Sequence, residues 1–110
     1  MMQKEIHLVQ LDPASGSEQK GIRPAVIISG DSMNDALDIC IICPLSSVIK
    51  NYPGCTVLKK SKTNGLDQDS EVLTFQVRVI SKSRLIRKIG EISQSELTEI
   101  KKGLIDILTY

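Results

Sequence analysis

The sequence predicts an α+β domain in which a small, strongly curved antiparallel sheet or barrel is followed by one C-terminal helix. Short runs rich in β-branched residues, separated by turn residues, occupy most of the chain, and a single helical pattern ends it. Hydrophobic residues make up 41% of the 110 residues and charged residues 25%, which is typical of a folded domain. We therefore expect a single domain over residues 1–110.

The N-terminal part is predicted to contain a strand and then a loop. Apolar and polar side chains alternate over Glu5–Leu11, as they do in a half-buried strand, and Asp12-Pro13 ends the pattern. Residues 14–22 contain two glycines and few apolar side chains, so we expect a mobile loop there.

The middle of the chain is predicted to supply the other strands. Pro24–Ser29 is a continuous apolar run and Leu37–Cys43 is rich in β-branched residues, so we expect two buried strands, the second of which Pro44 should end. The polar segment 30–35 between them should form a turn or a short helix. Further strands are expected at Cys55–Leu58, Glu71–Ile80 and Ile86–Ile89.

The last segment has the pattern of an amphipathic helix. Ser93 and Glu96 have the spacing of a capping box, and Ile92 can pack on Leu97 one turn later. Gly103 inside the helix costs about 1 kcal/mol relative to alanine and permits close packing. The apolar stripe of this helix is predicted to consist of Leu97, Ile100, Leu104, Ile107 and Leu108.

The cysteine and histidine content predicts neither a metal nor a cofactor. Three cysteines cannot form a closed set of disulfides, and they fit a reducing compartment. Cys40 and Cys43 have the CxxC spacing, but residues three apart on a strand face opposite sides, so we expect buried thiols. Redox use and metal binding are the lesser alternatives. His7, the only histidine, is expected to be a half-buried strand residue.

Charge and hydropathy exclude several classes of protein. The net charge is only +1, which argues against a polybasic protein that coats DNA. No apolar run approaches the ~20 residues that span a bilayer, and no signal peptide is visible. We therefore expect a cytoplasmic protein with no membrane partner. Basic side chains are in excess after residue 55, either as solvated surface or as a track for phosphates.

Three polar clusters are candidates for chemistry. Arg23 directly precedes a buried strand, where its guanidinium can bind a phosphate or pair with Glu18 to fix the loop. The pair Ser46-Ser47 follows a strand, either as catalytic hydroxyls or as turn residues. Gln76 and Arg78 are two apart on an expected strand, so both should face the same side.

Five short motifs follow one another along the chain. They read Leu11-Asp12-Pro13 through Gly16-Ser17-Glu18-Gln19 and Gly21-Ile22-Arg23-Pro24; Cys43-Pro44-Leu45-Ser46-Ser47; Lys50-Asn51-Tyr52-Pro53; Gly65-Leu66 with Asp69-Ser70; and Gln76-Val77-Arg78. In this order they resemble the signature of the PemK/MazF toxin family, and the similarity spans about residues 5–108. One such motif alone would be a weak signal, whereas five in order are specific.

This resemblance implies an SH3-like β-barrel toxin of a type II toxin-antitoxin system. Such a toxin cleaves single-stranded RNA, usually mRNA, sequence-selectively and without a metal or cofactor, by attack of a ribose 2′-hydroxyl that leaves a 2′,3′-cyclic phosphate. It implies a homodimer and a cognate antitoxin that blocks the RNA groove. The catalytic residues implied by the resemblance are Arg23, Ser46 and Glu18. Those implied in RNA binding are Gln19, Ser47, Gln76 and Arg78.

Two departures from the family pattern bear on the mechanism. Phe75 stands where many members carry an acidic residue, and Ser17 stands where some carry a histidine. A phenyl ring cannot transfer a proton, so these departures predict either a mechanism built on an arginine and a hydroxyl or a reduced activity. The alternative function is a non-catalytic toxin of this fold that inhibits a macromolecular target such as DNA gyrase; a third is a member that only binds an antitoxin-like partner.

Overall fold

The computed structural model describes residues 1–11 and 21–109. The strands are β1 (Glu5–Gln10), β2 (Ile22–Ile27), β3 (Ile39–Ser46), β4 (Thr56–Leu58), β5 (Ser70–Val72), β6 (Arg78–Ser81) and β7 (Leu85–Glu91). The helices are α1 (Asp31–Ala36), α2 (Gln94–Thr109) and two 3-10 turns, η1 (Thr74–Gln76) and η2 (Lys82–Arg84). Among the described residues, no helix combines the length and the apolar character needed to cross a bilayer. The loop predicted at 14–22 lies mostly outside the described residues.

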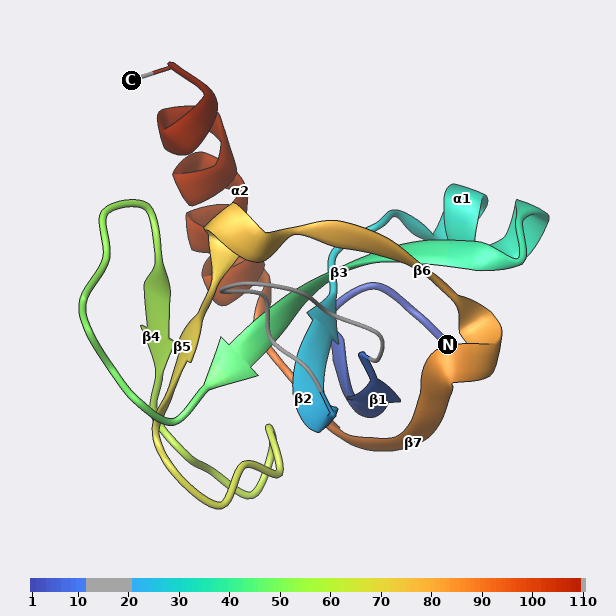
Figure 1. Cartoon of the computed structure of the whole chain (residues 1–110), viewed down its shortest axis with the longest axis horizontal. Coiled ribbons are helices and arrows are strands. Elements are labelled where there is room, and N and C mark those ends of the chain that lie inside the picture. The colour runs from blue at the N-terminus through green and yellow to red at the C-terminus, as the bar shows by residue number, and fades with distance from the viewer. Residues whose placement is uncertain (12–20, 110) are drawn as a thin grey trace.

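The seven strands form one antiparallel sheet in the order β4-β5-β3-β2-β1-β7, with β6 paired to β3 beside this path. β3 is the hub, because successive parts of it pair with β6, β2 and β5. Figure 1 shows the sheet bending strongly, with β4 and β5 on one side and β6 and β7 curving around the other. The predicted curved antiparallel sheet with a C-terminal helix is confirmed. Within the described part of the chain the sheet stays open, since no pairing joins β6 to β7.

Two of the strand boundaries that differ from the prediction lie at prolines. β2 begins at Ile22 rather than after Pro24, because Pro24 lies opposite Leu8 of β1 in the ladder. β3 runs through Pro44 to Ser46 instead of ending at Pro44. The Pro44 carbonyl still bonds within the sheet, since it accepts a hydrogen bond from the Leu73 N–H at 2.9 Å. The missing N–H of proline therefore does not end the strand here.

The predicted strand Glu71–Ile80 is wrong as one element. The structure divides it into β5, the 3-10 turn η1 and β6, with Gln76 in the turn and Arg78 in β6. The reason is that β5 and β6 pair with different ends of β3, so the chain has to turn between the two pairings. The Thr74 hydroxyl ties this turn to the Gly54 carbonyl at 2.9 Å.

The C-terminal helix α2 forms as predicted. The capping box closes with two hydrogen bonds, from the Ser93 N–H to Glu96 Oε1 at 2.8 Å and from the Glu96 N–H to Ser93 Oγ at 3.1 Å. Gly103 packs directly on the loop before β4, because a Cβ there would lie 2.0 Å from the Gly54 carbonyl oxygen. Leu108, the last residue of the predicted apolar stripe, is 84% exposed, so the stripe is not buried at its C-terminal end.

Two buried clusters form the core on opposite faces of β2 and β3. One lies against α2 and includes Val26 and Cys43, and the other includes Ile27 and Cys40. The two CxxC thiols are therefore buried and diverge, as predicted. Burial, and to a lesser extent the nearby Cys55, raises the pKa of Cys43 to about 12, so its thiolate is not populated at neutral pH.

Candidate active site

The strand pair β2–β3 brings the two main candidate residues, Arg23 and Ser46, to the same end of the sheet. In this pair Ala25 lies opposite Pro44, and the antiparallel register is regular. Continuing this register by two residues places Arg23 opposite Ser46, on the same face of the sheet. Two residues that are 23 positions apart in the sequence are therefore positioned by two neighbouring strands.

Both side chains line one solvent-open hollow of about 340 Å³, here called the Arg23–Ser46 cleft. Arg23 is exposed and Ser46 is half-buried, so a ligand can reach both groups. The other residues that line this cleft are Ser47, Val48, Lys50, Tyr52, Leu73, Phe75 and Gln76. Among the described residues, the cleft thus combines two cations, two serine hydroxyls, an amide and an aromatic rim.

The Ser46 hydroxyl is held by the backbone that follows it. Its Oγ accepts a hydrogen bond from the Val48 N–H at 3.1 Å, while the Val48 carbonyl oxygen lies 3.4 Å away. The second distance is at the limit of a hydrogen bond, so the hydroxyl proton can turn towards a ligand oxygen. Ser46 is therefore a positioned donor at the end of a rigid strand.

Glu71 positions part of the cleft, and the sequence did not predict this. Its side chain is fully buried, and its carboxylate accepts the N–H groups of Lys50 and Tyr52, both at 2.8 Å. These two bonds fix the segment that carries Lys50 and Tyr52 into the cleft. The only signal in the sequence was an acidic residue inside a short strand, next to Val72.

The two aromatic side chains at the cleft come from separate elements. Tyr52 follows the loop after β3, and Phe75 is in η1; their ring centroids are 5.0 Å apart and their planes are nearly perpendicular. Both rings are more than 40% exposed. Phe75 stands where the resemblance to the PemK/MazF family implies an acidic residue in many members. In this chain the position therefore supplies one of the two aromatic rings at the edge of the cleft.

The other predicted site residues are only partly brought together. Ser47 and Gln76 line the cleft with Arg23 and Ser46, whereas Arg78 lies on β6 opposite Ile42 and is not among the lining residues. The prediction that Gln76 and Arg78 share one strand face is therefore wrong, because the chain turns between them. The catalytic candidate Glu18 and the RNA-binding candidate Gln19 lie outside the described residues.

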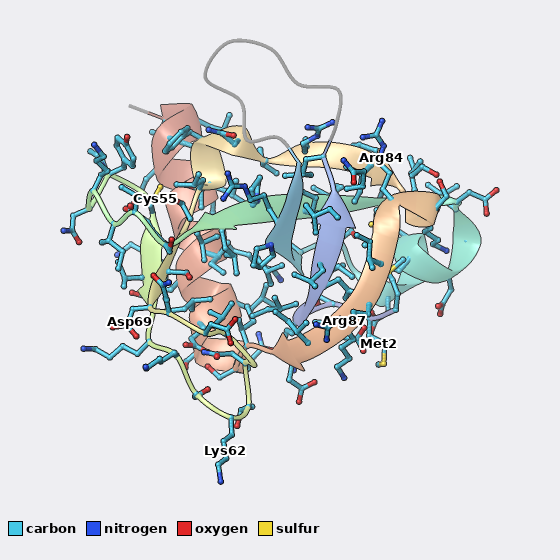
Figure 2. The ribbon with its side chains drawn as sticks, turned by 60° about the horizontal axis from the view of Figure 1, so that its bottom comes forward. Met2, Cys55, Lys62, Asp69, Arg84 and Arg87 are labelled. Carbon is cyan, nitrogen blue, oxygen red and sulfur yellow. The ribbon has the colours of Figure 1, made fainter. Side chains whose placement is uncertain are left out.

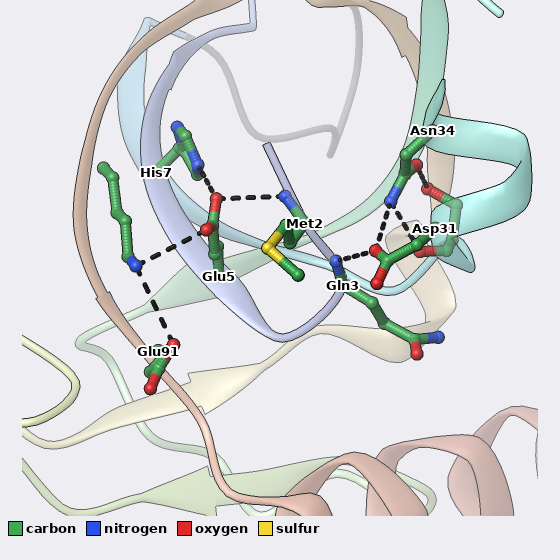
Figure 3. Close-up of polar contacts among 9 residues, drawn as sticks. Met2, Gln3, Glu5, His7, Asp31, Asn34 and Glu91 are labelled. Atoms are coloured by element: carbon green, nitrogen blue, oxygen red, sulfur yellow. Dashed lines mark hydrogen bonds and ion pairs between the residues drawn. The ribbon is translucent and has the colours of Figure 1, made fainter. Parts of the chain in front are cut away.

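Among the described residues, neither His7 nor an acidic side chain lines this cleft. The His7 ring is buried, with Nε2 2.9 Å from Glu5 Oε1, as Figure 3 shows, and it lies on β1 away from the cleft lining. In the described ranges 1–11 and 21–109, no three His, Cys, Asp or Glu side chains cluster closely enough to hold a metal ion.

A second hollow adjoins the cleft and shares Arg23 and Ser47 with it. It has a volume of about 510 Å³ and extends between β7 and the loop before β5. A ligand that binds at Arg23 can therefore continue along the surface into this second hollow.

Comparison with known proteins identifies the family. Residues 2–108 match the family described as PemK-like, MazF-like toxins of type II toxin-antitoxin systems. The chain is 37% identical to Endoribonuclease MazF9 of Mycobacterium tuberculosis, with 94% of this chain and 92% of that protein covered. It is 34% identical to Endoribonuclease MazF of Staphylococcus saprophyticus, with 94% and 88% covered.

A solved structure gives the same answer for the fold. A MazE-MazF crystal structure from Deinococcus radiodurans contains a chain that is 26% identical and has a TM-score of 0.79, with 98% of this chain and 95% of that one covered. The fold of this chain is thus found in a solved MazE-MazF structure, and the chain belongs to the PemK-like, MazF-like toxin family.

Proposed function

We propose that the chain cleaves single-stranded RNA in the Arg23–Ser46 cleft, sequence-selectively and without a metal ion. The chain is an endoribonuclease of this toxin family, since relatives that are 37% and 34% identical over 94% of it are named endoribonucleases. The observation that supports the proposed site is the meeting of Arg23 and Ser46 in one open hollow.

The reaction needs no nucleophile from the protein. The ribose 2′-hydroxyl attacks the adjacent phosphorus, the bond to the 5′-oxygen breaks, and the products are a 2′,3′-cyclic phosphate and a 5′-hydroxyl. Negative charge builds on the phosphorane, and a positioned guanidinium such as that of Arg23 stabilises it. Ser46 donates a hydrogen bond to a non-bridging phosphate oxygen, and the leaving 5′-oxygen takes its proton from water. Glu18 is the proposed acceptor of the 2′-hydroxyl proton, which contributes roughly 10²–10⁴-fold in rate.

The RNA contacts follow from the side chains around this centre. Ser47 and Gln76 are placed in the cleft to bond the ribose-phosphate chain or a base edge, and Lys50 adds a second cation next to Arg23. Gln19 and Arg78 complete the proposed set of RNA-binding residues, Arg78 at a phosphate beyond the cleft. The exposed rings of Tyr52 and Phe75 offer a face on which one base can stack.

The partners proposed for the chain are a cognate antitoxin and a second copy of itself. The related Deinococcus radiodurans structure is a MazE-MazF complex, and 98% of this chain is covered by its match to a chain of that structure. We infer that an antitoxin segment occupies the RNA-binding surface and blocks it. The proposed place of action is the cytoplasm, where mRNA is present and where the three free cysteines stay reduced.

One cleavage assay tests the proposal. The purified chain is incubated with a defined RNA in excess EDTA, and the 5′ ends of the fragments are mapped. We expect discrete cuts with a 2′,3′-cyclic phosphate end, and loss of these cuts in Arg23→Ala and Ser46→Ala. Intact RNA from a chain that still arrests growth would contradict the proposal and support the gyrase-type alternative.

A further inference from the structure

The second hollow has an apolar floor and a polar edge. Its floor includes Leu8 and Pro24, which are cross-strand partners, together with Leu45, Leu66 and Ile89. Such a floor suits the flat face of a nucleobase, because an unstacked base has to bury its ring against apolar groups. The volume of about 510 Å³ is within the range of small-ligand sites.

The wall before β5 is fixed from within. The buried Asn64 accepts the N–H groups of Ser61 at 2.9 Å and of Leu66 at 3.0 Å through one side-chain oxygen. Gly65 has a positive φ of 68°, and a Cβ there would lie 1.9 Å from the Ile89 carbonyl oxygen of β7. The loop before β5 therefore packs directly against β7. This contact positions Asp67 and Gln68 at the edge of the hollow.

These two side chains, Asp67 and Gln68, are exposed on that edge. The Gln68 carbonyl accepts a hydrogen bond from Ser70 Oγ at 3.0 Å, which fixes the backbone and leaves the side-chain amide to a ligand. Carboxylate and amide groups are the side chains that read the donors and acceptors of base edges.

The opposite wall is basic. Arg87 projects from β7, as Figure 2 shows, and Lys88 follows it. Lys88 is 3.4 Å from a Glu5 oxygen, so its charge is partly neutralised. Within residues 1–11 and 21–109, neither a hydrogen bond nor an ion pair is found for the Arg87 guanidinium. Arg87 is thus the cation of this wall that is best placed for a phosphate or a base face.

We propose that this second hollow is the base-reading subsite of the nuclease, which holds the nucleotide next to the phosphate at Arg23. Gln68 and Asp67 bond the edge of the base, and Arg87 holds the adjoining phosphate. The inference rests on the proposed RNA cleavage and extends it, because it assigns sequence selectivity to residues outside the Arg23–Ser46 cleft. The shared residues Arg23 and Ser47 fix the distance between the read base and the cut.

Cleavage-site mapping on a pool of random RNA tests this subsite. For Gln68→Ala and Asp67→Asn we expect the preference at one nucleotide beside the cut to fall about 10-fold, with the other positions unchanged. The matched control is Gln94→Ala, an exposed glutamine at the start of α2 that lines neither hollow. An unchanged site pattern in both variants, or an equal loss at all positions, would overturn the proposal.

A binding measurement separates this inference from the proposed cleavage. Backbone amide NMR shifts are followed while 2′-O-methyl oligonucleotides of A, C, G or U, which cannot be cleaved, are titrated into the wild-type chain. We expect one base to shift the amides of residues 65–68 and 87–89, and Gln68→Ala to reduce that difference. Shifts that are confined to the Arg23–Ser46 cleft, or equal for all four bases, contradict the subsite even if RNA is cleaved. A base-selective shift in a chain that does not cut RNA contradicts only the nuclease proposal.

Discussion

Arg23 is the residue on which the proposed chemistry depends most. Removing one preorganised donor to a charged transition state costs about 2.7–4 kcal/mol, so Arg23→Ala should lower the cleavage rate on the order of 10²–10³-fold. Arg23→Lys keeps the charge but loses the two-pronged geometry, and an intermediate rate is expected. The measurement is single-turnover cleavage of an end-labelled RNA. Lys102→Ala, which removes an exposed cation of α2, serves as control.

A fall in rate that merely reflects unfolding would be visible separately. Arg23 is exposed, so the melting temperature of Arg23→Ala should stay near that of the unchanged chain. Wild-type cleavage by this variant would remove Arg23 from the mechanism.

Glu71 should act on stability and on activity together. Glu71→Ala leaves the N–H groups of Lys50 and Tyr52 without their acceptor, at a cost of about 0.5–1.5 kcal/mol for each of these partly buried hydrogen bonds. Glu71→Gln keeps one acceptor oxygen and should lose less. Urea unfolding gives the first effect and the KM for RNA gives the second, because the freed segment carries Lys50 and Tyr52 at the cleft. An unchanged KM in a folded Glu71→Ala chain would show that the segment of Lys50 and Tyr52 keeps its position without the hydrogen bonds to Glu71.

At the scale of elements, the pairing of β1 with β7 should depend on pH through Glu5. Burial acts to raise the pKa of Glu5, but hydrogen bonds from His7 and the Met2 N–H, with the charge of Lys88, outweigh it and hold that pKa below 4.5 (Figure 3). A carboxyl group whose pKa is lowered by folding stabilises the fold at any pH above its ordinary pKa. This contribution is lost as the pH falls through the lowered pKa. Glu5→Gln should therefore be less stable than the unchanged chain at pH 7, by about 1 kcal/mol, and the gap should shrink below pH 4.5.

Urea titrations of both chains at pH 7 and at acid pH measure this gap. A difference that stays constant across the acid range would mean that Glu5 is not the group that titrates between β1 and β7.

Elements were predictable from the sequence where their causes are local. The capping box of Ser93 and Glu96 joins residues three apart, so the start of α2 could be predicted from the sequence. The end of β5 after Val72 could not be predicted in this way. It arises because β5 and β6 pair with different ends of β3. Likewise, no local pattern shows that Glu71 serves backbone groups 19 and 21 residues away.

For the site, composition and spacing left Arg23 and Ser46 with both a structural and a catalytic interpretation. The resemblance to a toxin family chose between these interpretations, and the register of β2 with β3 gives the physical reason why the two residues meet. The second hollow was not predicted, since its walls come from β7 and from a loop twenty residues earlier in the chain.

At the scale of the whole molecule, the charge is small but unevenly placed. The net charge is +1, yet four cations, Arg23, Lys50, Arg87 and Lys88, line the two adjoining hollows. RNA binding should therefore be local and only moderately salt-dependent, unlike the binding of a polybasic protein. For three to four neutralised phosphates on a single strand, the slope of log K against log salt concentration should be about −2 to −3.

Fluorescence titration of a 2′-O-methyl RNA at four salt concentrations measures this slope. Arg87→Gln should make the slope less steep by about 0.7, the contribution of one phosphate contact, whereas a Lys101→Ala, Lys102→Ala double variant on exposed helix positions should leave it unchanged. A slope near zero would mean that the RNA is held by base contacts alone. An equal loss in both variants would mean that the whole molecule attracts RNA, and the track from Arg23 to Arg87 would then have no special part in binding.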